Sequence, residues 1–89
     1  MKKVEEFNVI SFESTHMAIK SEKLLLDIGL NIRIIPVPRE ITASCGLALK
    51  INTDDFIEVK KLLEKNKIDF LGVYIVRKKG LKKEIEKII

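Results

Sequence analysis

Hydrophobic residues recur along the chain at two spacings, one typical of strands and one typical of helices. Short runs rich in β-branched or aromatic residues predict four strands, at residues 7–12, 32–37, 47–51 and 73–77. The first and third runs are each followed by a segment whose apolar residues lie three or four positions apart, which predicts two helices. The expected order is therefore strand, helix, strand, strand, helix, strand.

Polar residues and one glycine mark where the helices are expected to begin and end. Ser14 and Thr15 offer N-cap oxygens to the first helix. Gly29 supplies its stop, because glycine adopts the left-handed conformation at little cost. Thr53 is expected to cap the second helix. The helix positions expected to face inward are Met17, Ala18, Ser21, Leu24, Leu25, Ile28, Phe56, Val59 and Leu63.

This order of elements is that of the ferredoxin-like βαββαβ two-layer sandwich, an α+β fold. In that fold the antiparallel sheet has the strand order 4-1-3-2, which leaves the second strand at an edge. Pro36 within the second strand agrees with an edge position, because proline lacks the N–H that an inner strand donates. We therefore expect one α+β domain over residues 1–78.

Positive charge is concentrated at the end of the chain. The 89 residues carry a formal net charge of +4. Residues 1–76 hold eleven basic and eleven acidic residues, whereas residues 77–89 hold six basic and two acidic residues. The spacing of Leu81, Ile85 and the last two isoleucines predicts a basic helical tail over 79–89. A neutral body with one basic tail is a poor footprint for binding phosphates, so no nucleic-acid partner is expected.

Several functional classes lack the residues they need. No run of about 18 apolar residues occurs, and the basic start is interrupted by acids, so neither a membrane span nor a signal peptide is expected. The single cysteine has no partner for a disulfide within the chain, and we expect a cytoplasmic protein in which this thiol stays reduced. No metal or cofactor is expected, because Cys-x-x-Cys, glycine-rich phosphate-loop and His-Glu-x-x-His motifs do not occur.

One connection is longer than the predicted fold requires. Antiparallel strands usually close with loops of about 2–5 residues, whereas residues 38–46 separate the second and third predicted strands. In the predicted topology this loop lies at the same edge of the sheet as the start of the first helix. Cys45 lies near the end of the loop and is followed by Gly46, which would give close backbone access. Because loops of unneeded length are more often functional, we expect the site here.

Positive charge near Cys45 would favour its thiolate, which is the reactive form. Arg39 lies on the same loop, and the N-terminus of the first helix carries a partial positive charge. His16 is a candidate proton donor or general base for Cys45. The residues expected to stabilise a thiolate or a bound anion are Arg39, Thr42, Ser44, Gly46, Ser14 and Thr15.

Each candidate also has an ordinary structural interpretation. Cysteine is among the most buried residue types, so Cys45 is also consistent with a small core residue. His16 is also consistent with an ordinary first-turn helix residue, and Arg39 with a solvated loop arginine. The hydroxyl residues are equally typical of turns and helix caps. The residues alone leave both interpretations open.

The segments around this loop resemble a known family. The segments 11–15, 22–25, 35–39 and 44–49 are similar to the putative selenium/sulfur carrier protein-like family. Pro-Val-Pro-Arg at 36–39 followed by Ser-Cys-Gly-Leu at 44–47 is the more specific part, and the helix segment alone is weak. The resemblance extends over about residues 7–76. It implies a carrier rather than an enzyme, in which Cys45 holds sulfur or selenium as a persulfide or selenopersulfide. It also implies a cysteine desulfurase-type donor and an acceptor protein.

Two other functions remain open on the residues. The same loop edge could form the pocket of a small-ligand or anion-binding regulatory module, in which Arg39 is the essential residue. Alternatively, Cys45 and His16 could form the reactive pair of a small thiol enzyme. We rank the carrier first, the binding module second and the thiol enzyme third.

Overall fold

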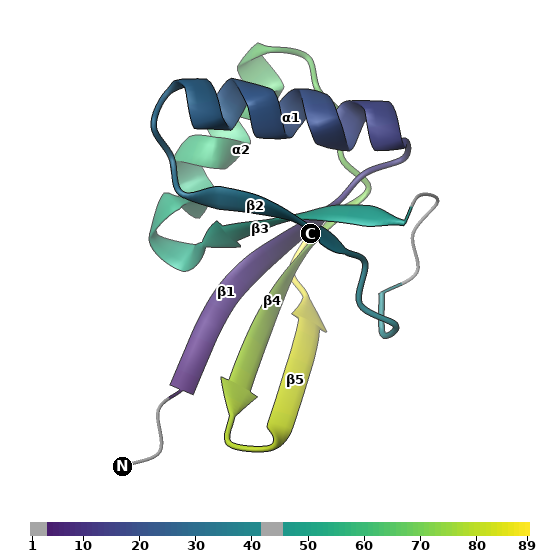
Figure 1. Ribbon diagram of the computed structural model, residues 1–89, viewed down its shortest axis with the longest axis vertical. Helices are drawn as coiled ribbons and strands as arrows, with labels where there is room; N and C mark the ends of the chain where they lie inside the picture. The colour runs from purple at the N-terminus through teal and green to yellow at the C-terminus, as the bar shows by residue number, and fades with distance from the viewer. Residues whose placement is uncertain (1–3, 42–45) are drawn as a thin grey trace.

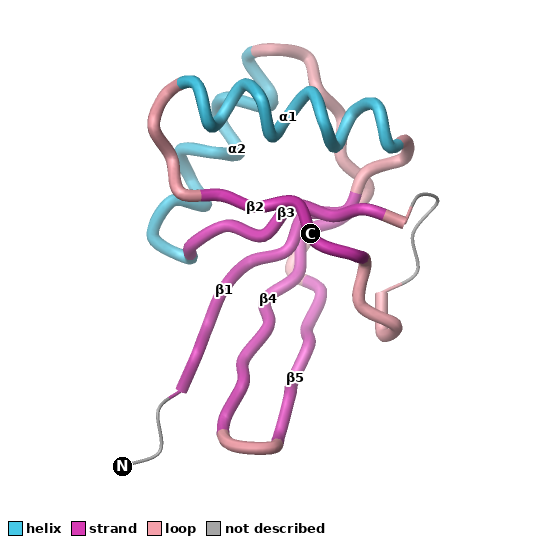
Figure 2. The backbone as a smooth tube through the Cα atoms, in the orientation of Figure 1, coloured by secondary structure: helices cyan, strands magenta, loops and turns pink. Residues whose placement is uncertain are grey.

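The structure is a computed structural model that describes residues 4–41 and 46–89. Its helices and strands are β1 (Val4–Ser11), α1 (Thr15–Asp27), β2 (Ile32–Pro36), β3 (Leu47–Asn52), the 3₁₀ turn η1 (Thr53–Asp55), α2 (Phe56–Lys65), β4 (Gly72–Lys79) and β5 (Lys82–Lys87). The strands form one antiparallel sheet in the order β2-β3-β1-β4-β5. Both α-helices lie on the same face of this sheet (Figures 1 and 2).

The predicted four-stranded ferredoxin-like sheet, with order 4-1-3-2 and a helical tail, is wrong. The sheet has five strands, and the segment expected to form the helical tail contributes the fifth. β5 pairs with β4 from Lys79 opposite Lys82 to Tyr74 opposite Lys87. The last residues continue along β4, where the N–H of Ile88 donates to the carbonyl oxygen of Val73 at 2.8 Å.

A tight turn explains why the end of the chain forms a strand. Gly80 and Leu81 alone connect the paired residues Lys79 and Lys82. Gly80 has a φ of 60°, and glycine at the first of two turn residues is typical of the type II′ turn, whose twist matches that of paired strands. Leu81 is fully exposed while Ile85 is half-buried against β4. The apolar residues of the tail therefore do not share one helical face.

The edge position that Pro36 predicted for β2 is confirmed, because β2 pairs only with β3. β1 occupies the middle of the sheet, between β3 and β4. Its first three residues are exposed, whereas every residue from Phe7 to Ser11 is buried. Figure 1 shows the reason: the start of β1 and the β4–β5 hairpin extend beyond the area that the helices cover.

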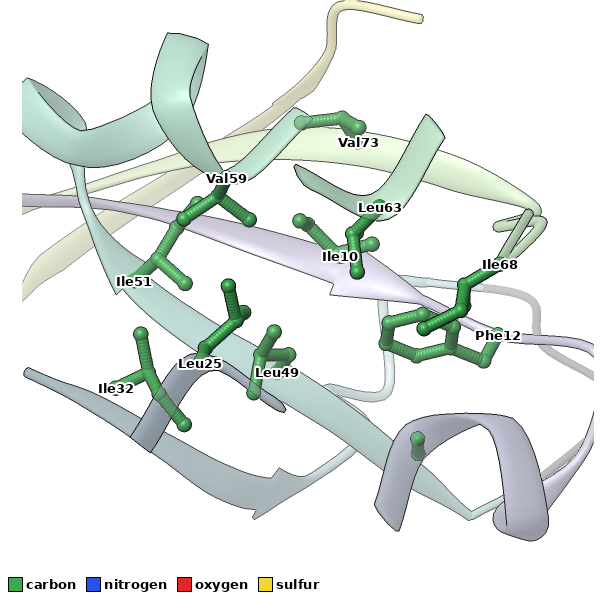
Figure 3. Packing of buried hydrophobic residues seen from close by; sticks show 11 residues of the cluster. Ile10, Phe12, Leu25, Ile32, Leu49, Ile51, Val59, Leu63, Ile68 and Val73 are labelled. Atoms are coloured by element: carbon green, nitrogen blue, oxygen red, sulfur yellow. The ribbon is translucent and has the colours of Figure 1, made fainter. Parts of the chain in front are cut away.

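The helices pack on the sheet through the positions that their spacing predicted. Ala18 and Leu25 of α1, and Val59 and Leu63 of α2, are fully buried. Figure 3 shows the two α2 side chains pointing toward the strands. Ile28 was expected on the same face but is 48% exposed, because it follows the last residue of α1. The buried residues of this main cluster are Ile10, Phe12, Ala18, Leu25, Ile32, Leu49, Ile51, Val59, Leu63, Ile68 and Val73.

The ends of the helices follow the capping signals only in part. Gly29 has a φ of 87°, and its N–H donates to the carbonyl oxygen of Leu26 at 3.0 Å. The N–H of Leu30 donates to the carbonyl oxygen of Leu25 at 3.1 Å, which completes a Schellman motif and confirms the predicted stop. Thr53 was expected to cap the second helix but instead opens η1, and α2 begins only at residue 56.

A second, smaller cluster lies on the sheet face opposite the helices. Its buried members, here called the second cluster, are Phe7, Val9, Ile41, Ala48 and Val76. The ammonium groups of Lys50 and Lys78 lie 4.3 and 5.6 Å from the centre of the Phe7 ring. The alkyl stems of lysines commonly cover apolar surface in this way. The sheet therefore buries apolar side chains on both of its faces.

The positive φ of Gly80 gives a test that separates the hairpin from a helical tail. We expect Gly80→Ala to lower the free energy of unfolding by about 1 kcal/mol, because alanine is strained at positive φ. Urea denaturation measures the change. Gly46→Ala is the matched control, since a Cβ there meets nothing within 4 Å. A stability gain in Gly80→Ala, as expected for glycine replaced inside a helix, would contradict the hairpin.

Candidate functional site

One edge of the sheet gathers the segments that were expected to form the site. Ser11 at the end of β1 lies opposite Ala48 and Gly72, and Pro36 at the end of β2 lies opposite Leu47. We call this the loop edge. α1 begins four residues after the last residue of β1, and the connection between β2 and β3 leaves and rejoins the sheet here (Figure 1). The strand register thus brings the end of β1, the end of β2 and the start of β3 to one edge, and the site expected there remains a prediction.

Three of the expected site residues, Thr42, Ser44 and Cys45, lie outside the described residues, and their roles remain predictions. Gly46, which follows Cys45 in the sequence, is exposed. Its carbonyl oxygen accepts a hydrogen bond at 3.0 Å from the N–H of Val37, one residue beyond β2. The ladder between β2 and β3 therefore fixes the backbone up to Gly46.

The start of α1 is exposed at the loop edge. Ser14 caps the helix: its side-chain oxygen accepts from the N–H of Met17 at 3.2 Å, and its carbonyl oxygen accepts from Ala18 at 3.2 Å. Ser14, Thr15 and His16 are all exposed. The Ser14 hydroxyl thus has the structural role of a cap, while its exposure leaves the end of the helix open to solvent.

The part of the long connection that is described runs over the face opposite the helices. Ile41 is 5% exposed and belongs to the second cluster. Its N–H donates to the carbonyl oxygen of Pro38 at 3.0 Å, which closes a turn. Glu40 forms an ion pair at 3.5 Å with Lys83 of β5. Figure 1 shows this segment (dark teal) bending away from α1 and α2. The length of the connection therefore has a structural use, which is to cover apolar sheet surface.

Arg39 is exposed within this turn. Among the residues that the structure describes, no hydrogen bond or ion pair joins it to the start of α1. The turn that carries it is held by Glu40 toward β5, on the other face of the sheet. The cooperation of Arg39 with the N-terminus of α1 remains a prediction.

Sequence reasoning missed two residues that shape this region. Ile41 is a single apolar residue within a polar loop, and that contrast was the available signal for its burial. Ser11 is fully buried at the loop edge, where its hydroxyl donates to the carbonyl oxygen of Gly72 at 3.4 Å. Within residues 4–41 and 46–89, no group of three or more His, Cys, Asp or Glu is placed to hold a metal ion. No helix in those ranges is long and apolar enough to span a bilayer.

The burial of Ile41 predicts a large effect on stability. We expect Ile41→Ala to lower the free energy of unfolding by about 2–4 kcal/mol, because it removes a buried side chain from the second cluster. Ile57→Ala on α2, where the side chain is 66% exposed, should change it by less than about 0.5 kcal/mol. Urea denaturation compares the two variants, and equal effects would show that the connection does not cover this face.

The chain matches the family described as putative Se/S carrier protein-like over residues 7–75. It is 34% identical over 67 residues to an uncharacterized protein of Methanocaldococcus jannaschii. That match covers 75% of this chain and 34% of the archaeal protein, so the chain spans about a third of the length of this curated relative. No solved structure matches the chain. The family match includes the whole β2–β3 connection and ends before β5.

Proposed function

The chain belongs to the putative Se/S carrier protein-like family, and on that premise we propose that it carries sulfur or selenium on Cys45. The proposal rests on one observation: the family match spans residues 7–75 and includes the single cysteine of the chain. A chalcogen held as a persulfide or selenopersulfide needs a thiol, since the thiolate is the nucleophile that accepts it. Cys45 alone can supply that group in this sequence.

Loading is an exchange at sulfur that involves no net oxidation. The thiolate of Cys45 attacks the terminal sulfur of a persulfide on a donor enzyme of the cysteine desulfurase type. A new S–S bond forms on Cys45 while the S–S bond of the donor breaks, and its electron pair leaves on the donor cysteine as a thiolate. The proton of the terminal sulfur stays with the transferred atom. Selenium is loaded by the same exchange when the donor holds a terminal selenium.

Unloading repeats this exchange with an acceptor protein. A thiolate of the acceptor attacks the terminal chalcogen, and Cys45 leaves as a thiolate that is ready for the next cycle. Both steps require the partner to reach the sulfur of Cys45. The exposure of Gly46 and of the first residues of α1 supports a loop edge that a partner can approach. The identities of donor and acceptor are the part of the proposal that rests on the family alone.

The neighbouring residues are assigned secondary roles in this proposal. The N-terminus of α1 lies at the loop edge with its partial positive charge, which favours an anion there. Arg39 adds a full positive charge from the long connection. Thr42 and Ser44 donate hydrogen bonds to the terminal chalcogen. His16 is not needed, because the exchange itself moves no proton to or from Cys45.

The mass of the intact protein tests the carrier function. After incubation with a cysteine desulfurase and cysteine, we expect an added mass of one sulfur atom that a reductant removes. The same enzyme supplied with selenocysteine tests for selenium. Cys45→Ser should show no adduct in either reaction. An unmodified wild-type protein, or an adduct that persists in Cys45→Ser, would exclude Cys45 as the carrier residue.

The secondary roles are tested by the rate of loading. We expect Arg39→Gln to slow the appearance of the adduct, because it removes a positive charge from the connection that holds Cys45. Arg33→Gln, at an exposed position on β2, removes the same charge elsewhere and should leave the rate unchanged. His16→Ala should also load at the wild-type rate. A loss of loading in His16→Ala would instead favour the thiol enzyme.

A further inference from the structure

The end of the β4–β5 hairpin concentrates positive charge on the folded sheet. Residues 78–83, here called the hairpin tip, contain four lysines around the Gly80–Leu81 turn. The register places Lys78 opposite Lys83 and Lys79 opposite Lys82, so each face of the hairpin presents a pair of lysines. Like charges directly opposite each other destabilise an antiparallel pair. Internal stability therefore does not explain this arrangement.

Acidic residues near the hairpin neutralise it only in part. Glu40 forms an ion pair with Lys83 at 3.5 Å. Glu6 and Glu86 both lie against Arg77, at 2.9 and 3.8 Å. The two lysines that flank the turn form no ion pair with any residue in the described part of the chain. Lys78 also forms no ion pair with a described residue, and its ammonium group lies 5.6 Å from the centre of the Phe7 ring. An external anion can therefore engage these three lysines without displacing a carboxylate.

The turn of the hairpin tip also carries an exposed apolar side chain. Leu81 is completely exposed, although turns of this type accept polar residues equally well. Together with Gly80 it lines a surface hollow between Lys79 and Lys82. A second hollow of about 200 Å³ on the same side is lined by these two lysines, Arg77, Glu84 and Val4, which is 52% exposed. Its lining thus holds three cations and one carboxylate. The turn therefore presents an apolar side chain directly beside two lysines.

The turn of the hairpin tip extends beyond the helices. Figures 1 and 2 show the hairpin projecting past the helices, with both of its faces uncovered at the turn. β4 runs eight residues from the loop edge to the tip, which is a distance of about 23 Å at about 3.3 Å per residue. A surface that engages the tip therefore leaves the loop edge free.

We propose that the hairpin tip docks end-on onto an anionic lipid surface. Leu81 enters the boundary between headgroups and acyl chains, while Lys79 and Lys82 contact lipid phosphates beside it. Lysines on both faces suit this approach, because headgroups surround a tip that is inserted end-on. Nucleic-acid phosphates would also attract the lysines, and an apolar side chain can wedge between bases. The rest of the chain is close to neutral, however, and a single basic end is a poor footprint for following a phosphate backbone. This inference does not depend on the chemistry of Cys45.

Binding to vesicles tests the proposal on the full chain. We expect the protein to sediment with vesicles of equal parts phosphatidylcholine and phosphatidylglycerol, and not with vesicles of phosphatidylcholine alone. Lys79→Gln combined with Lys82→Gln should weaken binding about 25-fold, since each lysine near an anionic surface contributes about a fivefold factor. Leu81→Ser should also weaken binding, and this loss should persist at high salt.

Two controls separate docking from changes in folding. Lys20→Gln combined with Lys23→Gln removes the same charge from exposed positions on α1 and should leave binding unchanged. The hairpin double variant should unfold at a higher urea concentration than wild type, because it removes a cross-strand repulsion. For Lys79→Gln combined with Lys82→Gln we therefore expect higher stability to urea together with weaker binding to vesicles. Equal loss in both double variants, or no loss in either, would overturn the proposal. Tighter binding to a DNA duplex than to the vesicles would assign the tip to nucleic acid instead.

Discussion

Burial of β1 on both of its faces is the constraint on which the rest of the sheet depends. Val9 and Ile10 are adjacent in the sequence and point to opposite faces, yet both are completely buried. Because the two helices cover only one face, the other face needs a cover of its own. Ile41 from the β2–β3 connection and Ile85 from β5 provide part of that cover. The long connection and the added strand are therefore responses to one packing requirement.

The β2–β3 connection covers the second cluster and also carries the cysteine of the proposed function. Its first part is held against the second cluster by Ile41 and by the ion pair of Glu40 with Lys83. Its last residue, Gly46, is fixed by the ladder between β2 and β3. The segment between these two anchors holds the cysteine that the proposed carrier function requires. Both ends of this connection are thus attached to the sheet. Rigid scaffolds commonly support functional residues on loops in this way.

Most elements could be predicted from local patterns, because local interactions determine them. The stop of α1 follows from Gly29, whose positive φ serves a hydrogen-bonded motif contained within a few residues. The edge position of β2 follows from the missing N–H of Pro36. β5 was missed because the spacing of Leu81 and Ile85 fits a helix, and only pairing with β4 makes the segment a strand. That pairing is a tertiary interaction, which local periodicity does not contain.

The arrangement of strand ends around the candidate site was predictable, whereas the path of the β2–β3 connection was not. Strand order and direction suffice to bring the start of α1 and the β2–β3 connection to one edge. The direction that the connection takes after Pro38 depends on where Ile41 finds apolar surface, and that surface exists only once β1, β3 and β4 are assembled. The position of Arg39 follows from this assembled packing.

The family match ends at residue 75, and β5 pairs with β4 alone at the margin of the sheet. The contacts of β5 beyond β4 are the packing of Ile85 on the second cluster and the ion pair of Lys83 with Glu40. The family match therefore includes the connection that carries Cys45, whereas β5 and the hairpin tip lie outside it.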